Sequence, residues 1–161
     1  MTTMTSAFAA AVLAAGSLSC AATATAGPLT PEQVAVMAPV HQFTDGFNVG
    51  DVAAAVAACT DPVIIIDEFS PYAWHGAGAM DRWMSDYVKD AGQRGITDGV
   101  VTLHHPKHVD VANDRAYVVV PANYEFNQNG KAVKQTRSTL TVALVKTSAG
   151  WRITGWSWAT N

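Results

Sequence analysis

The order of hydrophobic patterns along the chain constrains the fold most strongly. Apolar side chains recur at helical spacing from Val34 to Phe47 and again in the clearest run, Met80, Trp83, Met84, Tyr87 and Val88. From residue 100 onward apolar and polar residues alternate, and short turns separate the runs. Helices followed by an antiparallel meander predict an α+β fold, in which N-terminal helices cover one face of a curved sheet.

An aliphatic strand, residues 63–66, leads directly into Asp67. Its sequence, VIII, predicts a strand that is packed on both faces, so Asp67 reaches the rim of a hydrophobic interior. Burial there raises a carboxyl pKa and favours a general base. Alternatively, Asp67 ends the strand in solvent or caps the next loop. Glu68 points the opposite way and is expected to be solvated.

The first helix has clear end signals. Thr30 and Gln33 form a predicted capping box, and Pro39 predicts a kink or a restart near Val40. Gly50 is expected to end this helix, and Asp51 to cap a short second one.

The loop from Glu68 to His75 supplies candidate pocket residues. Tyr72, Trp74 and His75 are expected at the lip of a pocket, where His75 relays a proton to or from Asp67. The alternative is that Trp74 plugs the interior and His75 is exposed. The tryptophans of the last strand, residues 151–158, are interpreted as core and interface residues, and an exposed aromatic sheet face would favour a homodimer.

A two-residue turn at Asn129-Gly130 sets a hairpin register. It pairs Phe126 with Val133 and would place Val120 opposite Thr139. One face of the hairpin then carries Val118, Val120, Ala122, Tyr124, Phe126, Val133, Gln135, Arg137, Thr139 and Thr141. On that face Arg137 would grip an anionic ligand or pair with Asp67, whereas a slip of one residue makes it a surface charge.

Residues 1–26 predict a signal peptide. They carry no charged side chain, contain the run AFAAAVLAAG and end in Ala24-Thr25-Ala26, so cleavage before Gly27 and export to the periplasm or medium are expected. A lipoprotein signal ending at Cys20 fits less well, because Ser17 stands where an aliphatic residue is expected. The apolar run is too short for a membrane span.

The mature chain, residues 27–161, has the length of one domain. Cys59 is its only cysteine, which excludes an intramolecular disulfide. The net charge of -3 and the scattered basic residues argue against nucleic acid and favour a small apolar or acidic organic ligand. Adjacent strand residues face opposite ways, so the histidines of residues 104–108 are not expected to share a metal, and no cofactor is expected.

Three segments together resemble the nuclear transport factor 2-like superfamily, a cone-shaped α+β fold that includes ketosteroid isomerase and the SnoaL-like polyketide cyclases. They are FNVGD, IIIDEFSPYAWHGAGAM and GWRITGWSWA, and the resemblance covers nearly the whole mature chain. It implies that Asp67 occupies the place of the carboxylate base. Phe43 stands where an oxyanion tyrosine is expected and Thr139 near the second oxyanion acid, while Cys59 and Met84 stand where supporting tyrosines are expected.

The loss of one oxyanion donor typically costs roughly 3 to 4 kcal/mol in the barrier, so steroid isomerisation by the usual mechanism is disfavoured. We therefore expect an exported small-molecule-binding protein, acting as an isomerase, cyclase or dehydratase with Asp67 as base and His75 assisting. The expected pocket residues are Phe43, Tyr72, Trp74, Met84, Val120, Tyr124, Arg137 and Thr139. The alternative is a non-catalytic ligand-binding or dimerisation module of the same fold.

Overall fold

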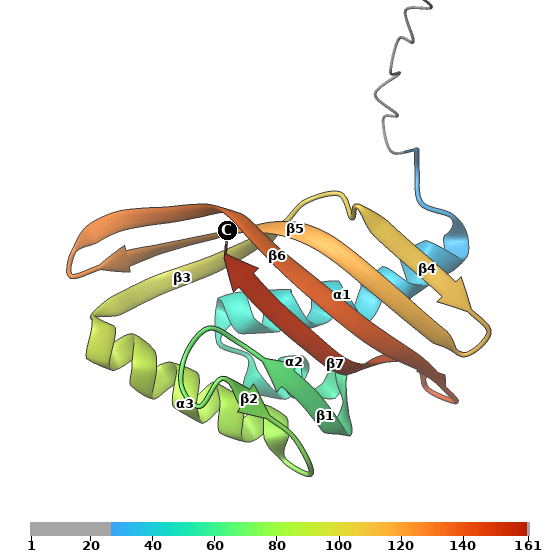
Figure 1. Ribbon diagram of the computed structural model, residues 1–161, viewed down its shortest axis with the longest axis horizontal. Helices are drawn as coiled ribbons and strands as arrows, with labels where there is room; N and C mark the ends of the chain where they lie inside the picture. Colours follow the sequence, from blue (N-terminus) through green and yellow to red (C-terminus); the bar gives the residue numbers. More distant parts are fainter. Residues whose placement is uncertain (1–26, 161) are drawn as a thin grey trace, which may run out of the picture.

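The computed structural model describes residues 27–160, so the predicted signal peptide lies outside the described residues. Within them, three helices lie against one face of a curved seven-stranded sheet (Figure 1). In chain order the elements are α1 (Pro31–Val49), α2 (Val52–Ala57), β1 (Cys59–Ile66), β2 (Ala73–Trp74), α3 (Ala79–Arg94), β3 (Ile96–Leu103), β4 (His108–Ala112), β5 (Arg115–Gln128), β6 (Lys131–Thr147) and β7 (Gly150–Thr160). The predicted α+β architecture is confirmed.

The sheet is mixed and mostly antiparallel, with the strand order β2-β1-β7-β6-β5-β3. Strand β1, which lies outside the predicted meander, runs parallel to β7. One detail differs from the predicted antiparallel meander. Strands β3 and β4 do not pair with each other in succession, because both pair with the long strand β5, along its C-terminal and N-terminal halves respectively. Pro106 is buried in the connection between them, which bends the chain from one half to the other.

The helix-end signals act as predicted. The side chain of Thr30 accepts a hydrogen bond from the backbone nitrogen of Gln33, and the side-chain oxygen of Gln33 accepts one from the backbone nitrogen of Thr30. Gly50 ends α1 in the left-handed conformation, with φ at 71°, and Asp51 caps α2. Helix α1 continues through Pro39, so the alternative of a restart there is wrong.

Strand β1 is packed on one face only. Val63 and Ile65 are buried, whereas Ile64 and Ile66 are 60% and 54% exposed. The expectation of a strand packed on both faces is therefore wrong, because the helices cover only the inner face of the sheet. The outer face carries Ile64 and Ile66 into solvent beside Tyr117, which is 47% exposed.

A bulge in β6 corrects the hairpin register. Phe126 pairs with Val133, as predicted, but Ala122 pairs with Ser138 where the uninterrupted register requires Arg137. One extra residue of β6 between these pairs moves every later side chain to the opposite face. Val120 therefore pairs with Leu140. The inner face receives Ser138, Leu140 and Val142, and not Arg137, Thr139 and Thr141.

The core lies between the helices and the inner face of the sheet. Its fully buried side chains include Val36 and Val40 of α1, Val118 and Val120 of β5, and Ile153 of β7. No helix within residues 27–160 is both long enough and apolar enough to cross a membrane.

The contact between α1 and α2 makes a stability prediction. A Cβ atom at Gly46 would lie 2.9 Å from the backbone nitrogen of Ala55, so Gly46→Ala should lower the free energy of unfolding by about 1–3 kcal/mol. Gly92 of α3 is a matched control, since a Cβ there meets no atom within 4 Å. Gly92→Ala should raise the free energy of unfolding by about 0.5–1 kcal/mol, since alanine favours helices. Urea denaturation measures both, and equal effects would contradict the close packing at Gly46.

Candidate active site

A cavity of about 120 Å³ lies between α1, α3 and the inner face of the sheet. Half of its eighteen lining residues are aromatic, namely Phe43, Phe47, Phe69, Trp83, Tyr87, Tyr124, Phe126, Trp156 and Trp158. The polar lining residues are Thr44, Asp67, Glu68, Asp90, Arg94 and Gln135. Such a mainly apolar hollow with a few polar groups is typical of a small-molecule site.

Asp67 is the most constrained polar group in the cavity. Its Oδ1 accepts a hydrogen bond from the backbone nitrogen of Glu68 at 2.7 Å, and its Oδ2 accepts one from Nε1 of Trp83 at 2.9 Å. Its own backbone nitrogen donates to the carbonyl of Tyr72 at 3.1 Å. Both carboxylate oxygens and the backbone are therefore fixed in position.

The surroundings of Asp67 favour its protonated form. The pKa of this carboxyl is raised from 3.8 to about 6, mainly because the group is buried. The hydrogen bonds from Glu68 and Trp83 lower the pKa, and the charges of Glu68 and Asp90 raise it, within that net shift. A pKa near 6 leaves most molecules ionised at neutral pH and makes the carboxylate a stronger base than an exposed one.

One face of α3 supplies much of the cavity wall. Trp83, Tyr87, Asp90 and Arg94 follow one another at intervals of four, three and four residues, and all four line the cavity. The Arg94 guanidinium lies 3.2 Å from the Asp90 carboxylate. Val88, which the helical pattern had assigned to the buried face, is 65% exposed.

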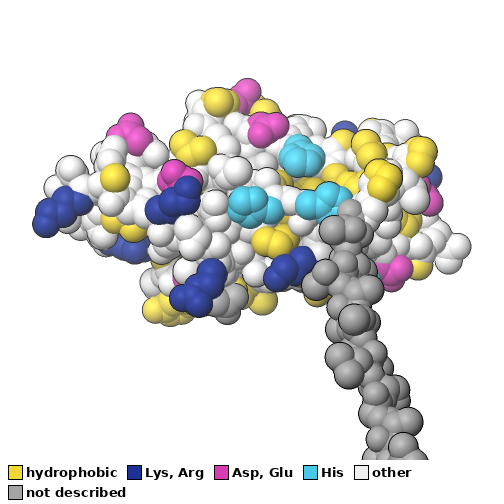
Figure 2. Space-filling model, turned by 90° about the horizontal axis from the view of Figure 1, so that it is seen from above, with side chains coloured by type: hydrophobic (Ala, Val, Ile, Leu, Met, Phe, Trp, Pro, Cys, Tyr) yellow, Lys and Arg dark blue, Asp and Glu magenta, His cyan; other side chains and the backbone are white. Residues whose placement is uncertain are grey.

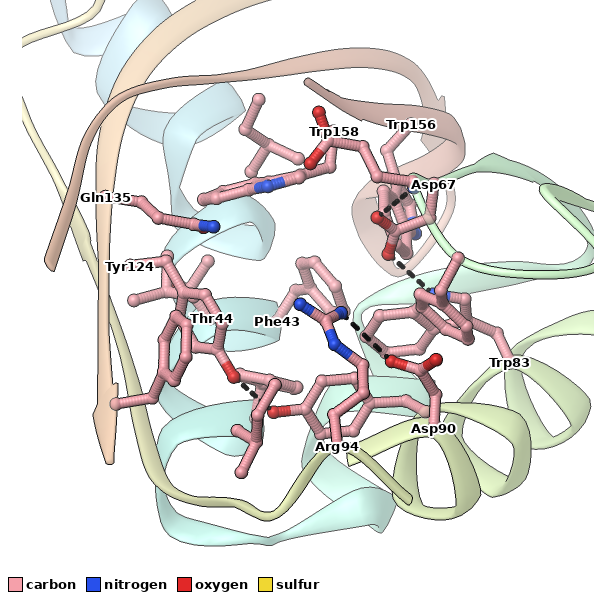
Figure 3. Close-up of a pocket in the computed structure, with 18 residues that line it drawn as sticks. Phe43, Thr44, Asp67, Trp83, Asp90, Arg94, Tyr124, Gln135, Trp156 and Trp158 are labelled. Carbon is pink, nitrogen blue, oxygen red and sulfur yellow. Dashed lines mark hydrogen bonds and ion pairs between the residues drawn. The ribbon is translucent and has the colours of Figure 1, made fainter. Parts of the chain in front are cut away.

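Two tyrosine hydroxyls meet in the cavity. The Oη atoms of Tyr87 and Tyr124 lie 2.6 Å apart and share a hydrogen bond. In Figure 3, Tyr124 and Gln135 lie on one side of the cavity, and Asp67, Trp83 and Trp156 lie on the other. Burial raises the pKa of Tyr87 and that of Tyr124, so both remain protonated at physiological pH.

Gly99 of β3 makes room for Tyr124. A Cβ atom at this position would lie 2.5 Å from the Tyr124 hydroxyl and 3.0 Å from its ring. Any larger residue at position 99 would displace the ring. Gly99 therefore helps to set the position of the hydroxyl pair.

Of the residues predicted for the site, Phe43, Asp67 and Tyr124 line the cavity. Phe43 packs against Trp83 and Trp156, with ring centroids 6.0 and 5.2 Å away. Its phenyl ring offers no hydrogen-bond donor to the cavity. Nε1 of Trp156 is buried without an acceptor among the described residues, so Trp83 is the indole that holds Asp67.

The loop that carries Tyr72, Trp74 and His75 lies outside the cavity. Tyr72 is 62% exposed, and His75 is exposed, with its carbonyl accepting a hydrogen bond from Arg82. Trp74 is buried behind the cavity wall, where it packs on Phe69 and its Nε1 donates to Asp86 at 3.0 Å. None of the three loop residues lines the cavity, because β2 turns the loop back along the edge of β1.

The other predicted pocket residues are also outside the cavity. Met84 and Val120 belong to the buried core, and the bulge in β6 turns Arg137 and Thr139 away from the inner face. The cation at the cavity is Arg94 instead. Glu68 was expected in solvent; it is exposed, yet it also lines the cavity and accepts a hydrogen bond from the backbone of Thr160.

Three residues that matter to the site, Trp83, Tyr87 and Arg94, were not predicted as site residues from the sequence. Extending the helical spacing from Trp83 through Asp90 could have found the other two. Among residues 27–160, no group of three or more histidine, cysteine, aspartate or glutamate side chains is placed to hold a metal. Figure 2 shows histidines near the middle of one face, with basic side chains mostly to the lower left of them and acidic side chains mostly along the upper edge.

Asp67→Asn tests the cost of burying the carboxylate. The folded chain keeps a proton on Asp67 that the unfolded chain loses between pH 3.8 and about 6. The stability that the folded chain gains by binding this proton more tightly is therefore complete below pH 3.8 and is lost as the pH rises through about 6. Relative to wild type, the variant should gain up to about 3 kcal/mol in the free energy of unfolding between pH 4 and pH 8.

Urea denaturation at the two pH values measures this difference. Asp45→Asn, at an exposed position on α1, is the matched control and should show no such change. A relative stability of Asp67→Asn that is the same at both pH values would contradict the raised pKa.

Structural comparison places the chain among known folds. A ketosteroid isomerase-like protein from Erwinia carotovora atroseptica is 16% identical with a TM-score of 0.65, and the match covers 82% of this chain and 98% of that one. ActVI-ORFA from Streptomyces coelicolor gives 15% identity, a TM-score of 0.65 and the same two coverages. An NTF2-like superfamily protein from Salmonella enterica is 11% identical with a TM-score of 0.66, and the match covers 80% of this chain and 89% of that one. At these identities the likeness shows the fold alone.

No curated protein matches the sequence significantly. The SnoaL-like domain model matches residues 36–157, which includes every residue that lines the cavity except Trp158. SnoaL-like domains generally bind small molecules. The chain belongs to the SnoaL-like domain family, and its fold is that of NTF2-like proteins.

Proposed function

We propose that this protein binds a small organic molecule in the aromatic cavity and moves a proton on it with Asp67 as the general base. The observation that carries the proposal is a half-buried carboxylate with a pKa of about 6, held by two hydrogen bonds inside a cavity of ligand size. The reaction would be an isomerisation, a cyclisation or a dehydration.

The hydrogen bonds to Asp67 suit this role. Each carboxylate oxygen has two lone pairs, and the bonds from Glu68 and Trp83 occupy one on each oxygen. A free lone pair remains on each to accept a proton from a bound molecule. Because the carboxylate is fixed before the ligand arrives, less reorganisation is needed in the reaction.

The three reactions share a first step on a carbonyl compound. Asp67 takes a proton from the carbon beside the carbonyl, the C–H electron pair becomes a carbon–carbon double bond, and the carbonyl π pair moves to oxygen. In an isomerisation Asp67 returns the proton to another carbon. In a dehydration the enolate expels the β-hydroxyl group, which takes the proton and leaves as water, and in a cyclisation the enolate carbon attacks a second carbonyl, whose oxygen takes the proton. The similarity in fold to a protein described as ketosteroid isomerase-like supports this class of chemistry.

Export and dimerisation belong to the same proposal. The N-terminal segment has the pattern of a signal peptide. The outer face of the sheet exposes Ile64, Ile66 and Tyr117, a surface that a second copy would cover. With Arg94 beside an aromatic wall, the ligand is a small apolar or acidic organic molecule. A ligand-binding module without catalysis is the second candidate, because Phe43 offers no hydrogen-bond donor.

Proton exchange separates the two candidates. Acetophenone is a ring-sized ketone whose methyl protons exchange slowly with D₂O, and proton NMR follows the loss of their signal. Wild-type protein should accelerate exchange, with a rate that rises through about pH 6 as Asp67 ionises. Asp67→Asn should lower the catalysed rate by at least about 100-fold, since general base catalysis contributes that much.

Asp45→Asn is the control, because Asp45 is exposed on α1 and does not line the cavity. This variant should accelerate the exchange of the acetophenone methyl protons as much as wild-type protein does. If Asp67→Asn retains the wild-type rate, or if wild-type protein gives no acceleration, Asp67 is not the base and the binding module is favoured.

A further inference from the structure

We infer that the Tyr87–Tyr124 hydroxyl pair binds a carbonyl oxygen, and that the cavity takes a ring-sized carbonyl compound with this oxygen at the tyrosines. The inference rests on the proposed function for its catalytic part, since the carbon acid must reach Asp67. Its binding part is independent, because it requires only the cavity and the two hydroxyls.

The hydroxyl pair has a proton to give. A single hydrogen bond between two hydroxyls uses one of their two protons, so the second remains for a third oxygen. Burial keeps both phenols protonated, because it raises the pKa of Tyr87 and that of Tyr124. The pair is therefore a donor and not a base.

The pair shares the cavity with Asp67. All three residues line it, and Figure 3 shows Tyr124 across the cavity from Asp67. The Asp67 charge also contributes to raising the pKa of both tyrosines, so the groups interact electrostatically. A molecule between them would place its carbonyl oxygen at the hydroxyls and an adjacent carbon toward the carboxylate.

The two tyrosines supply the hydrogen-bond donor that Phe43 and Thr139 do not. Phe43 has no donor, and Thr139 faces away from the cavity after the bulge in β6. Tyr87 comes from α3 and Tyr124 from β5, so the donor is built from different elements. Gly99 of β3 leaves the space that the Tyr124 ring occupies, so a third element contributes to the same arrangement.

The size of the cavity limits the ligand. Its volume is about 120 Å³. An engineered apolar cavity of about 150 Å³ holds benzene, so the enclosed space here takes about one ring, and a substituent or a fused four-ring steroid must extend beyond it. The aromatic side chains around it favour an aromatic or unsaturated ring.

The chemical step is balanced without a further reactant. Asp67 accepts the proton from carbon, the C–H electron pair forms the enol double bond, and the carbonyl oxygen takes the π pair. The tyrosine hydrogen bond strengthens as negative charge develops on that oxygen. When Asp67 returns the proton to carbon, the charge flows back and the hydrogen bond weakens.

Matched ligands test the binding. Acetophenone and α-methylstyrene have the same shape, but a CH₂ group replaces the carbonyl oxygen in the second. Ligand-observed NMR titration should show that wild-type protein prefers acetophenone, by about threefold to tenfold for a neutral hydrogen bond. Tyr124→Phe or Tyr87→Phe should remove most of this preference, because each deletes one hydroxyl of the pair while keeping the ring.

Tyr117→Phe is the matched control, since Tyr117 is on the outer face of the sheet, and it should keep the full preference. The inference is overturned if both tyrosine variants retain the preference for acetophenone, or if they weaken the binding of acetophenone and α-methylstyrene equally.

Exchange rates distinguish failure of this inference from failure of the proposed function. Tyr124→Phe should slow acetophenone exchange by about 100-fold, as the loss of an oxyanion donor does. If exchange depends on Asp67 but on neither tyrosine, the function stands and this inference fails. If no exchange occurs but the preference for acetophenone depends on the tyrosines, the ligand assignment stands and the catalytic proposal fails.

Discussion

The hydrogen bond from the Trp83 indole to the Asp67 carboxylate is the interaction on which the site depends. It joins α3 to the chain just after β1, elements that come together only through packing. The Trp83 ring also stacks on Tyr87 and meets Trp156 edge to face, with centroids 5.8 and 4.8 Å away. One side chain therefore holds the carboxylate, the neighbouring donor pair and the aromatic wall in one arrangement.

The same burial that suits Asp67 to proton transfer costs stability. Two hydrogen bonds offset only part of the desolvation of the carboxylate, since its pKa remains about two units above that of a free aspartate. Charged groups held in apolar surroundings are common at functional sites, because the folded core compensates for them. Here the compensation comes from the core between the helices and the inner face of the sheet, which includes Val40, Ile65 and Val120.

Irregular positions in the sheet decide which side chains face the cavity. The extra residue in β6 removes Arg137 and Thr139 from the inner face and leaves Gln135 there. A second irregularity, between Ala143 and Leu144 in the pairing of β6 with β7, lies beside the segment that carries Trp156 and Trp158 to the cavity. Bulges of this kind redirect side chains near active sites without changing the order of the strands.

The fold was predictable to a large extent, because helix and strand periods are local properties of the sequence. The capping box at Thr30, the turn at Asn129-Gly130 and the α+β order follow from neighbouring residues alone. The position of Asp67 after an aliphatic strand is local in the same sense. The burial of only one face of β1 was not predictable, since it depends on where the helices lie.

The sequence alone determined the architecture and placed a carboxylate at the end of β1, because hydrophobic spacing and turn chemistry act over a few residues. Only the tertiary structure decided what surrounds that carboxylate. Trp83, Tyr87 and Tyr124 lie far from Asp67 or from one another along the chain. A single inserted residue in β6 turned the Arg137 side chain to the opposite face of the sheet. Contacts across elements depend on register and packing, which no local pattern specifies.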